Sequence, residues 1–277
     1  MTDRYAVIGN PIAQSKSPLI HSAFAQVTGQ DIDYGKLLGP LGEFAATVDA
    51  FRVSGGRGMN VTAPFKLDAF AYATDLAPSA QMAGAVNAMK FEGGKVYAEN
   101  FDGVGLVRDL VHNLACPLKG RRVLILGAGG ATRGALLPLL AEQPAELVIV
   151  NRTVAKAHEL AALAQQHQTG QVPVQGLGYA DLQGQAFDVV LNASSSSLSA
   201  ELPPLPASVF APGCLAYDLT YGKGLTPFLK LAQHAGVTQL ADGVGMLAEQ
   251  AAEAFAWWRG VRPDTAAVIA QLTVPLV

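Results

Sequence analysis

A chain of 277 residues, half of them hydrophobic and 15% charged, is longer than one ordinary core requires and too apolar to be disordered, so the sequence predicts two compact domains. The formal net charge of −3 excludes a broad basic surface for nucleic acid or an acidic membrane. Cys116 and Cys214 lack metal-ligand spacing and are too few for a disulfide framework, so we expect reduced cysteines and no metal site. The start does not resemble a signal peptide, and no apolar run reaches the roughly 18 residues that span a bilayer. We therefore expect a cytoplasmic protein.

The first hundred residues alternate between strand-like and helix-like segments. Residues 4–9 form an apolar run closed by the turn formers Gly9 and Pro11, and Ser17-Pro18 is a typical helix start, with Gly29 as the end. Further strands are predicted at 32–38 and 58–62, with a helix at 41–53 and another after Pro64. Strands connected through helices predict a mostly parallel sheet.

A hairpin and a linker lead into a second alternating unit. Residues 86–98 hold two strand-like runs around a Gly-Gly turn, which predicts an antiparallel edge, and residues 116–120 read as the linker that follows a helix ending near 114. The second unit has predicted strands at 122–127, 146–150, 187–191 and 215–219 and helices at 130–142 and 153–167. This is the layout of a nucleotide-binding domain.

Two helices predicted near the end of the chain, at about 243–259 and 264–276, have no strand pattern beside them, so we expect them to fold back onto the first domain. The predicted fold class is therefore α/β. It comprises a three-layer α/β domain with a mostly parallel sheet, residues 1–102 with 241–277, and a Rossmann-like domain, residues 103–240.

A glycine-rich turn follows the predicted strand at 122–127. Its sequence, Gly127-Ala128-Gly129-Gly130-Ala131-Thr132, puts small residues where the backbone would approach a pyrophosphate at the free N–H groups of the next helix. Thr132 stands at the third glycine position of the G-x-G-x-x-G pattern, so a bare tight turn is the alternative interpretation.

The end of the next predicted strand indicates which dinucleotide would fit. NAD sites usually place Asp or Glu there, whereas this chain has Asn151-Arg152-Thr153, with Lys156 one helical turn later. Two cations and two polar side chains suit a ribose 2′-phosphate, which a carboxylate would repel. The pattern predicts NADP rather than NAD. The alternative is that Arg152 and Lys156 are solvated helix charges, and the glycine loop upstream is the observation that argues against it.

Polar residues gather at the predicted strand ends of the first domain, where open α/β sheets bind ligands. They are Ser15-Lys16-Ser17, Asn60-Val61-Thr62, Lys66, Asn87 and Asn100-Phe101-Asp102. Together they offer the donors and acceptors that a small hydroxylated ring needs. Taken singly, the serines would be helix caps and Lys66 a solvated charge.

Ordered motifs along the whole chain resemble those of the shikimate dehydrogenase family. They are Gly9-Asn10-Pro11, Ser15 to Pro18, Asn60 to Thr62, Pro64 to Lys66, Gly84 to Asn87, the loop from Gly127 to Gly134, Asn151 to Thr153, Asn192 to Ser195, Tyr217-Asp218, Thr226 to Leu229, and Asp242 to Leu247 followed by Gln250.

The resemblance implies roles for particular residues. Lys66 and Asp102 would form the catalytic pair. The implied substrate contacts are Ser15, Ser17, Thr62, Asn87, Tyr217 and Gln250. The implied NADP-binding residues are Gly127, Gly129, Gly130, Ala131, Asn151, Arg152, Thr153, Lys156 and Gly243.

The implied reaction is the interconversion of 3-dehydroshikimate and shikimate with NADPH and NADP. Residues 1–102 with 241–277 would bind the substrate and residues 103–240 the cofactor. An ammonium group beside the carbonyl oxygen, here that of Lys66, would stabilise the charge that hydride transfer creates and supply a proton. The expected partner is a small molecule, shikimate or a close analogue, with no nucleic acid and no membrane, and the protein would be a monomer or a homodimer.

Two departures from the family pattern keep alternatives open. Phe101 stands where the family usually has threonine before the aspartate, and Ser194 to Ser197 replaces the more usual Thr-Ser-Ser-Gly. A bulky ring beside Asp102 would reshape the substrate pocket, so a paralogue that prefers quinate or another hydroxylated ring acid is the nearest alternative. A non-catalytic NADP or metabolite sensor is the alternative of another class.

Overall fold

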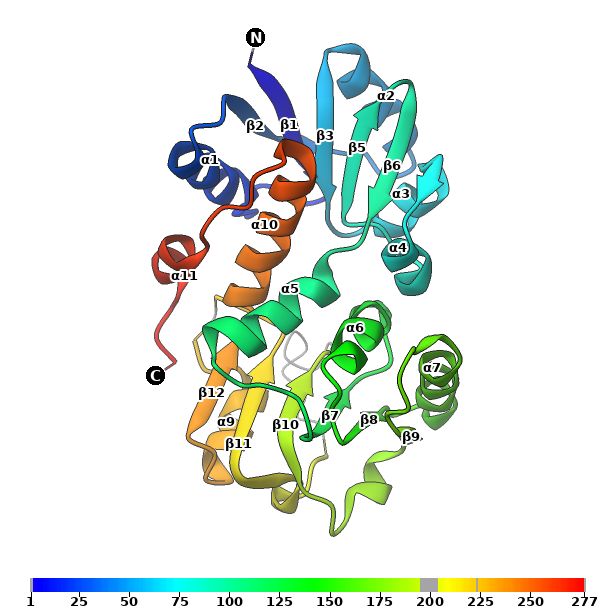
Figure 1. Ribbon diagram of the computed structural model, residues 1–277, viewed down its shortest axis with the longest axis vertical. Coiled ribbons are helices and arrows are strands. Elements are labelled where there is room, and N and C mark those ends of the chain that lie inside the picture. The colour runs from blue at the N-terminus through cyan, green and yellow to red at the C-terminus, as the bar shows by residue number, and fades with distance from the viewer. Residues whose placement is uncertain (1, 195–203, 223, 277) are drawn as a thin grey trace. The chain divides into compact units, whose positions relative to one another are not determined.

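The computed structural model describes residues 2–194, 204–222 and 224–276 (Figure 1). The chain forms two compact units, Met1–Gly105 with Ala248–Ala270, and Leu106–Leu247 with Gln271–Val277. Residues 241–247 and 271–277 therefore group with the second unit, whereas the sequence pattern assigns them to the first. Leu276 packs on the core of the second unit. The helical pattern at the end of the chain does not reveal this contact.

The first unit contains a six-stranded sheet in the order β2-β1-β3-β5-β6-β4 (Figure 1). Its strands are β1 Asp3–Gly9, β2 Ile32–Leu38, β3 Gly56–Val61, β4 Asp75–Leu76, β5 Ala88–Glu92 and β6 Lys95–Glu99. Its helices are α1 Ser17–Thr28, α2 Phe44–Val53, α3 Lys66–Tyr72, α4 Pro78–Ala83, the first turn of α5 Asp102–Arg108, and most of both α10 Val244–Arg259 and α11 Ala266–Leu272. The sheet is mostly parallel, as predicted, because only β5 runs antiparallel to its neighbours.

The predicted hairpin is present, but its prediction as an edge is wrong. β5 lies inside the sheet between β3 and β6, and the edge is the two-residue strand β4. A two-residue strand carries no alternation of apolar and polar positions, so the sequence pattern does not reveal it.

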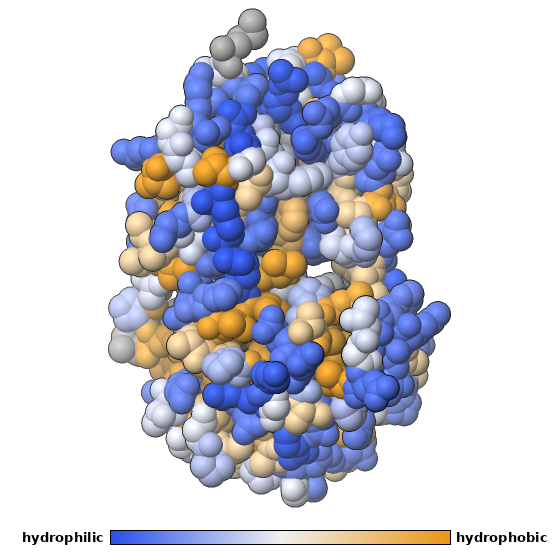
Figure 2. Space-filling model, in the orientation of Figure 1, coloured by the Kyte–Doolittle hydropathy of each residue, from blue (hydrophilic) through white to orange (hydrophobic). Residues whose placement is uncertain are grey.

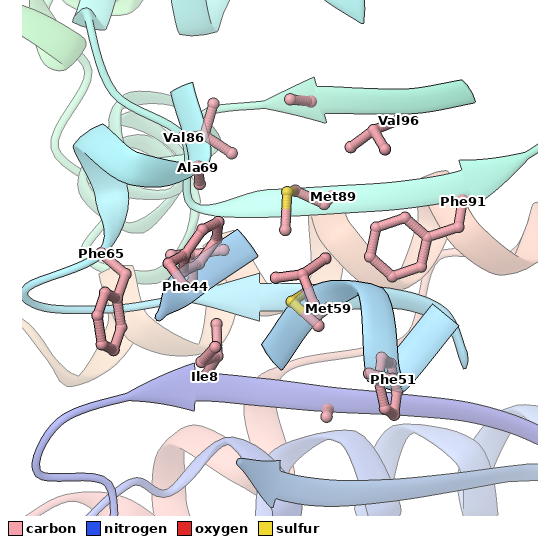
Figure 3. Close-up of a cluster of buried hydrophobic side chains, with 14 of the residues drawn as sticks. Ile8, Phe44, Phe51, Met59, Phe65, Ala69, Val86, Met89, Phe91 and Val96 are labelled. Atoms are coloured by element: carbon pink, nitrogen blue, oxygen red, sulfur yellow. The ribbon is translucent and has the colours of Figure 1, made fainter. Parts of the chain in front are cut away.

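Both faces of this sheet are buried, which gives the domain its three layers. Along β1, Ala6 and Ile8 point into one cluster of buried side chains, and Tyr5 and Val7 point into another. The first cluster holds Phe44, Val48 and Phe51 from α2 with Met59, Phe65 and Met89 (Figure 3). The second is closed by Ala254 and Trp258 from α10. Near-continuous apolar strands are what a sheet covered on both faces requires.

The second unit has a parallel six-stranded sheet in the order β12-β11-β10-β7-β8-β9. Its strands are β7 Arg122–Leu126, β8 Glu146–Val150, β9 Val174–Leu177, β10 Phe187–Asn192, β11 Phe210–Asp218 and β12 Gln239–Asp242. Its helices are α6 Gly130–Ala141, α7 Val154–His167 and α9 Pro227–His234, and a π-helical turn, Asp109–Asn113, extends α5.

This strand order confirms the Rossmann-like prediction. Counted from β7, the chain adds β8 and β9 on one side and then β10, β11 and β12 on the other, so the order reverses between β7 and β10. Dinucleotides bind at the carboxyl ends of the strands beside such a reversal. The glycine-rich turn starts from β7, on one side of this point.

Hydrophobic residues are scattered among hydrophilic ones over the first unit in the face drawn in Figure 2. Among the helices that the structure describes, none has both the length and the apolarity to cross a membrane.

Candidate active site

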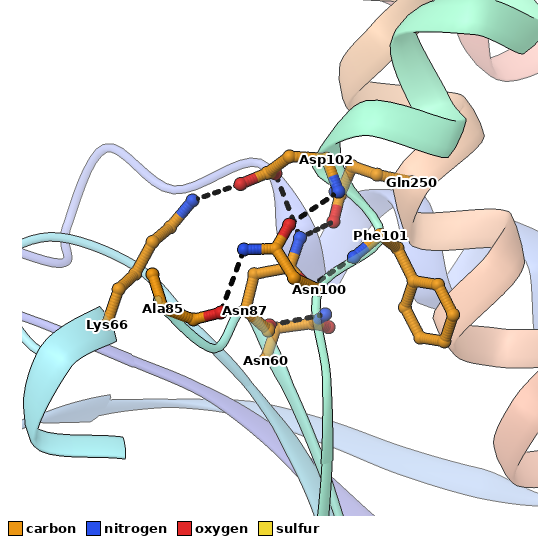
Figure 4. A network of polar contacts seen from close by, with 8 residues as sticks. All are labelled: Asn60, Lys66, Ala85, Asn87, Asn100, Phe101, Asp102 and Gln250. Atoms are coloured by element: carbon orange, nitrogen blue, oxygen red, sulfur yellow. Dashed lines mark hydrogen bonds and ion pairs between the residues drawn. The ribbon is translucent and has the colours of Figure 1, made fainter. Parts of the chain in front are cut away.

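An ion pair between Lys66 and Asp102 forms the centre of the polar network in the first unit (Figure 4). Lys66 begins α3 and Asp102 begins α5, and Lys66 Nζ lies 2.6 Å from Asp102 Oδ2. The two side chains keep 33% and 19% of their exposure, so solvent or a small molecule can reach the ammonium group. The structure thus brings together the two residues predicted as the catalytic pair, 36 positions apart in the chain.

Asn87 connects this pair to a residue from the far end of the chain. Its Nδ2 donates to Asp102 Oδ1 at 2.9 Å and lies 3.5 Å from Gln250 Oε1 on α10. Its Oδ1 accepts from the backbone N–H of Phe101 at 2.9 Å. Each side of the Asn87 amide is therefore occupied, which fixes the direction in which Asp102 points.

Asn100, which the sequence placed among the polar strand-end residues without assigning it a substrate contact of its own, is a further member of this network. Its Oδ1 accepts from the backbone N–H of Asp102 at 3.1 Å, and its Nδ2 donates to Ala85 O at 3.0 Å. The spacing Asn-x-Asp is the signal for this bond, because asparagine side chains accept from the backbone two residues on. Asn100 therefore holds the start of α5 against the loop before β5.

Three other predicted substrate contacts lie on loops at the carboxyl ends of β1 and β3. Ser15 and Ser17 have their hydroxyl oxygens 3.2 Å apart, and Ser15 Oγ accepts from the backbone N–H of Ser17 at 3.3 Å. Thr62 follows β3, and its backbone N–H donates to Ile8 O at 3.0 Å. Gly9 is needed beside it, because a β-carbon there would stand 2.6 Å from Thr62 Cγ2.

The ring of Phe101 points away from the Lys66–Asp102 pair (Figure 4). It packs edge-on against Trp257 of α10, with ring centroids 5.8 Å apart, and contributes to the cluster that includes Trp258. Phe101 contributes only its backbone N–H to Asn87, and a threonine at this position could make the same bond. The contacts that hold Asp102 therefore do not depend on the ring. The ring therefore belongs to the packing under α10 and does not line the Lys66–Asp102 pair.

Replacing Phe101 by threonine is accordingly expected to lower stability by about 1–2 kcal/mol, because a half-buried ring is lost from beside Trp257. The KM for the ring acid that the sequence resemblance implies is expected to stay within about threefold. Denaturant unfolding and steady-state kinetics of Phe101→Thr check both parts. A KM that falls tenfold would mean that the ring obstructs the substrate.

Tyr217 is placed differently from its predicted role. The ring, on β11, has no exposed surface, and its hydroxyl donates to Asp109 Oδ2 at 2.8 Å. Burial, and then the charge of Asp109, raise the pKa of this phenol, so it stays protonated as a donor. The structure supports a packing role for Tyr217. The tyrosine with accessible surface after this strand is Tyr221, which is 42% exposed.

The glycine-rich turn of the second unit has the form that a pyrophosphate needs. Gly127 has φ of 101°, and a β-carbon there would stand 3.1 Å from the backbone of Ser194, so this position requires glycine. Gly129 and Gly130 have open space where a β-carbon would lie. Ala131 is exposed in the first turn of α6, whose early N–H groups have no partner within the helix.

Thr132, the departure from the glycine pattern, supports the turn from inside. Its side chain is buried, and its hydroxyl donates to Gly127 O at 2.7 Å. The third glycine of the pattern normally allows a helix to pack closely on its strand. Here a hydroxyl fills that space and closes the loop.

The segment predicted to select the cofactor contacts the glycine turn directly. Asn151 Oδ1 accepts from the backbone N–H of Ala128 at 3.3 Å, and Asn151 Nδ2 donates to Thr153 O at 2.9 Å. Arg152, Thr153 and Lys156 are exposed around the start of α7. The positive charge of Arg152 also acts on the half-buried Tyr179, whose pKa burial raises and Arg152 lowers.

Gly243, the last predicted cofactor contact, has a packing reason to be glycine. It lies between β12 and α10, and a β-carbon there would stand 2.3 Å from Leu219 O. The departure at Ser194 to Ser197 is described only for Ser194, which contacts Gly127, because residues 195–203 lie outside the described part of the chain.

Comparison with known proteins matches three family models to the chain. They are the shikimate dehydrogenase substrate binding domain over residues 7–89, the shikimate / quinate 5-dehydrogenase domain over residues 109–200, and the shikimate 5'-dehydrogenase C-terminal domain over residues 243–273. Together they account for most of both units.

Whole-length relatives agree with these models. The shikimate dehydrogenase (NADP(+)) of Chromobacterium violaceum is 57% identical over 265 residues, 96% of each chain. The crystal structure of an Ael1 enzyme from Pseudomonas putida is 59% identical with a TM-score of 0.95, covering 100% of both chains. A shikimate 5-dehydrogenase from Thermus thermophilus, in complex with NADP(H) and shikimate, is 30% identical with a TM-score of 0.83, covering 97% of this chain and 98% of that one. The chain belongs to the shikimate dehydrogenase family.

Proposed function

We propose that this protein is an NADP-dependent oxidoreductase that interconverts shikimate and 3-dehydroshikimate, the step that serves aromatic amino acid biosynthesis in its family. The observation that carries the proposal is the Lys66–Asp102 ion pair, held by Asn87 in a chain 57% identical to a shikimate dehydrogenase (NADP(+)). A sensor would have no use for an accessible ammonium group braced in this way.

Lys66 is the proton donor and acceptor at the reacting oxygen. Hydride added to a carbonyl carbon leaves negative charge on oxygen, and an ammonium group beside that oxygen stabilises the charge and passes a proton to it. In the opposite direction the amine takes the proton from the hydroxyl. Asp102, at 2.6 Å, orients the Lys66 side chain, and its remaining acceptor capacity suits a neighbouring hydroxyl of the substrate.

The remaining polar side chains of the first unit hold the ring acid. Ser15 and Ser17 offer two adjacent hydroxyls for the carboxylate, which suits an anion because neither carries negative charge. Thr62, Asn87 and Gln250 offer donors and acceptors for the ring hydroxyls. Tyr217 is not included, because its only hydroxyl is bound to Asp109 and enclosed.

The residues at the carboxyl ends of β7 and β8 fit NADP. The turn at Gly127, Gly129, Gly130 and Ala131 allows a pyrophosphate to approach the backbone, and no carboxylate stands among residues 151–156 to repel a 2′-phosphate. Asn151, Arg152, Thr153 and Lys156 would hold that phosphate, and Gly243 would be a further contact of the cofactor. When bound, the cofactor supplies or accepts the hydride.

Arg152→Ala is expected to raise the KM for NADP at least about 10-fold, because a charge-assisted bond to the 2′-phosphate contributes about 1.5–3 kcal/mol. The KM for NAD, which lacks this phosphate, is expected to stay unchanged. Lys230→Ala, which removes an exposed charge from α9 in the same unit, is the matched control. Equal losses with NADP and NAD would contradict selection by Arg152.

The proposed function is tested by steady-state reduction of NADP with shikimate, then with quinate, each repeated with NAD. We expect shikimate with NADP to give the highest kcat/KM. Preference for quinate would favour the paralogue, and no turnover with either acid would overturn the proposal. We further propose a cytoplasmic location. The protein would be a monomer or a homodimer, and a sedimentation measurement of the purified protein distinguishes these two states.

A further inference from the structure

A buried tyrosine hydroxyl lies behind the proposed substrate contacts. Tyr34, on β2, is 8% exposed, and its hydroxyl donates to Asn60 Oδ1 at 2.6 Å. This one buried group thus binds directly to the last residues of β3.

Asn60 carries the connection onward to the Lys66–Asp102 pair. It is 6% exposed, and its Nδ2 lies 3.4 Å from the backbone oxygen of Asn87 (Figure 4). The backbone N–H of Val61 donates to that oxygen at 2.8 Å. Asn87 in turn binds Asp102 through its side chain. Four consecutive polar contacts therefore run from Tyr34 to Lys66.

The ring of Tyr34 is clamped, so its hydroxyl has one position. His21 stacks on it with ring centroids 4.2 Å apart and planes inclined by 7°, and Trp258 lies 6.4 Å away. A stacked, enclosed ring keeps its rotamer, and a hydroxyl on such a ring gives a fixed reference point for a flexible amide side chain.

We propose that Tyr34 is a positioning residue for the ring acid, with its hydroxyl fixing the Asn60 side chain and, through it, the Asn87 segment that holds Asp102. The inference rests on the proposed function. Because these groups hold the substrate before and during the reaction alike, loss of the hydroxyl raises the KM for shikimate more than it lowers kcat.

The test compares Tyr34→Phe with Tyr5→Phe. Tyr5 belongs to the same aromatic cluster and stacks on Trp258 at 4.7 Å, but among the described residues its hydroxyl makes no hydrogen bond with Asn60, Asn87 or Asp102. We expect Tyr34→Phe to raise the KM for shikimate about 10-fold, with kcat within threefold and the KM for NADP unchanged, and Tyr5→Phe to leave all three within twofold. Equal shikimate KM values in the two variants, with equal melting temperatures, would make the Tyr34 hydroxyl a packing feature and overturn the proposal.

A double-mutant cycle with Asn60→Ala tests the route. If Tyr34 acts through Asn60, adding Tyr34→Phe to Asn60→Ala changes the KM for shikimate by less than about twofold, whereas independent effects multiply. Should Tyr34→Phe not fold, Asn60→Ala alone decides, and an unchanged KM for shikimate there overturns the inference. Wild-type protein without shikimate turnover would instead refute the proposed function, so the two failures are distinguishable.

Discussion

Lys66→Met is expected to lower the turnover of shikimate at least about 100-fold, while the Kd for shikimate changes little. The substitution keeps an unbranched apolar stem like that of lysine and removes the ammonium group, which lies 2.6 Å from Asp102. Positioned proton transfer contributes about 10²- to 10⁴-fold to such reactions. Measurement of kcat with both substrates saturating, and of shikimate binding by calorimetry, separates the loss of chemistry from the loss of binding.

Lys90→Met provides a matched control for this substitution. Lys90 lies on β5 of the same sheet, pairs with Glu92 at 2.8 Å and has a side-chain exposure of 30%, close to the 33% of Lys66. Among the described residues, Lys90 makes neither a hydrogen bond nor an ion pair with Asn87 or Asp102. Lys90→Met is expected to keep full turnover. A Lys66→Met enzyme that retains a third of its turnover would exclude Lys66 from the reaction.

The sequence predicted the central strands and one edge strand, β2, but missed the other three edge strands. β1, β3, β7, β8 and β10 lie inside their sheets and are buried on both faces, so each is a run of apolar residues that stands out from its surroundings. The strands that the sequence missed, β4, β9 and β12, all lie at sheet edges. Edge strands are short and pair on one side only, so few apolar positions mark them.

The site residues were predicted as far as position in the chain determines their environment. Lys66 and Asp102 begin helices, and Asn87 directly precedes β5, whose antiparallel direction puts its start at the same edge of the sheet. The direction of a side chain is a tertiary property. Phe101 turns toward Trp257, more than 150 residues away, and Tyr217 turns toward Asp109, so neither orientation is readable from neighbouring residues.

The free energy of unfolding is expected to fall by about 3 kcal/mol between pH 7 and about pH 4.5 because His21 is buried. The imidazole is fully enclosed among Tyr34, Phe24, Phe255 and Trp258, and neither nitrogen has a hydrogen-bond partner among the described residues. Burial lowers the pKa of His21 from 6.5 to about 3, and the nearby Asn60 side chain opposes this shift only in part.

The sign of this effect follows from which state binds the proton. Below pH 6.5 the unfolded chain protonates His21, whereas the folded protein keeps it neutral until about pH 3. The unfolded state therefore binds more protons across this window, and each pH unit of descent removes about 1.4 kcal/mol of stability. Full stability is present above pH 6.5, and the loss is complete only near the folded-state pKa.

His21→Phe isolates this effect, because it retains a stacked ring and removes the titrating group. Urea unfolding at several pH values measures the free energy of unfolding of both proteins. Between pH 7 and about pH 4.5, this free energy is expected to fall about 3 kcal/mol more in the wild type than in His21→Phe. Glu99 does not mimic this result: burial raises the pKa of its carboxyl, so the folded state binds that proton first and gains stability as the pH falls. Parallel declines in the two proteins would therefore show that the His21 ring is not enclosed in solution as it is in the structure.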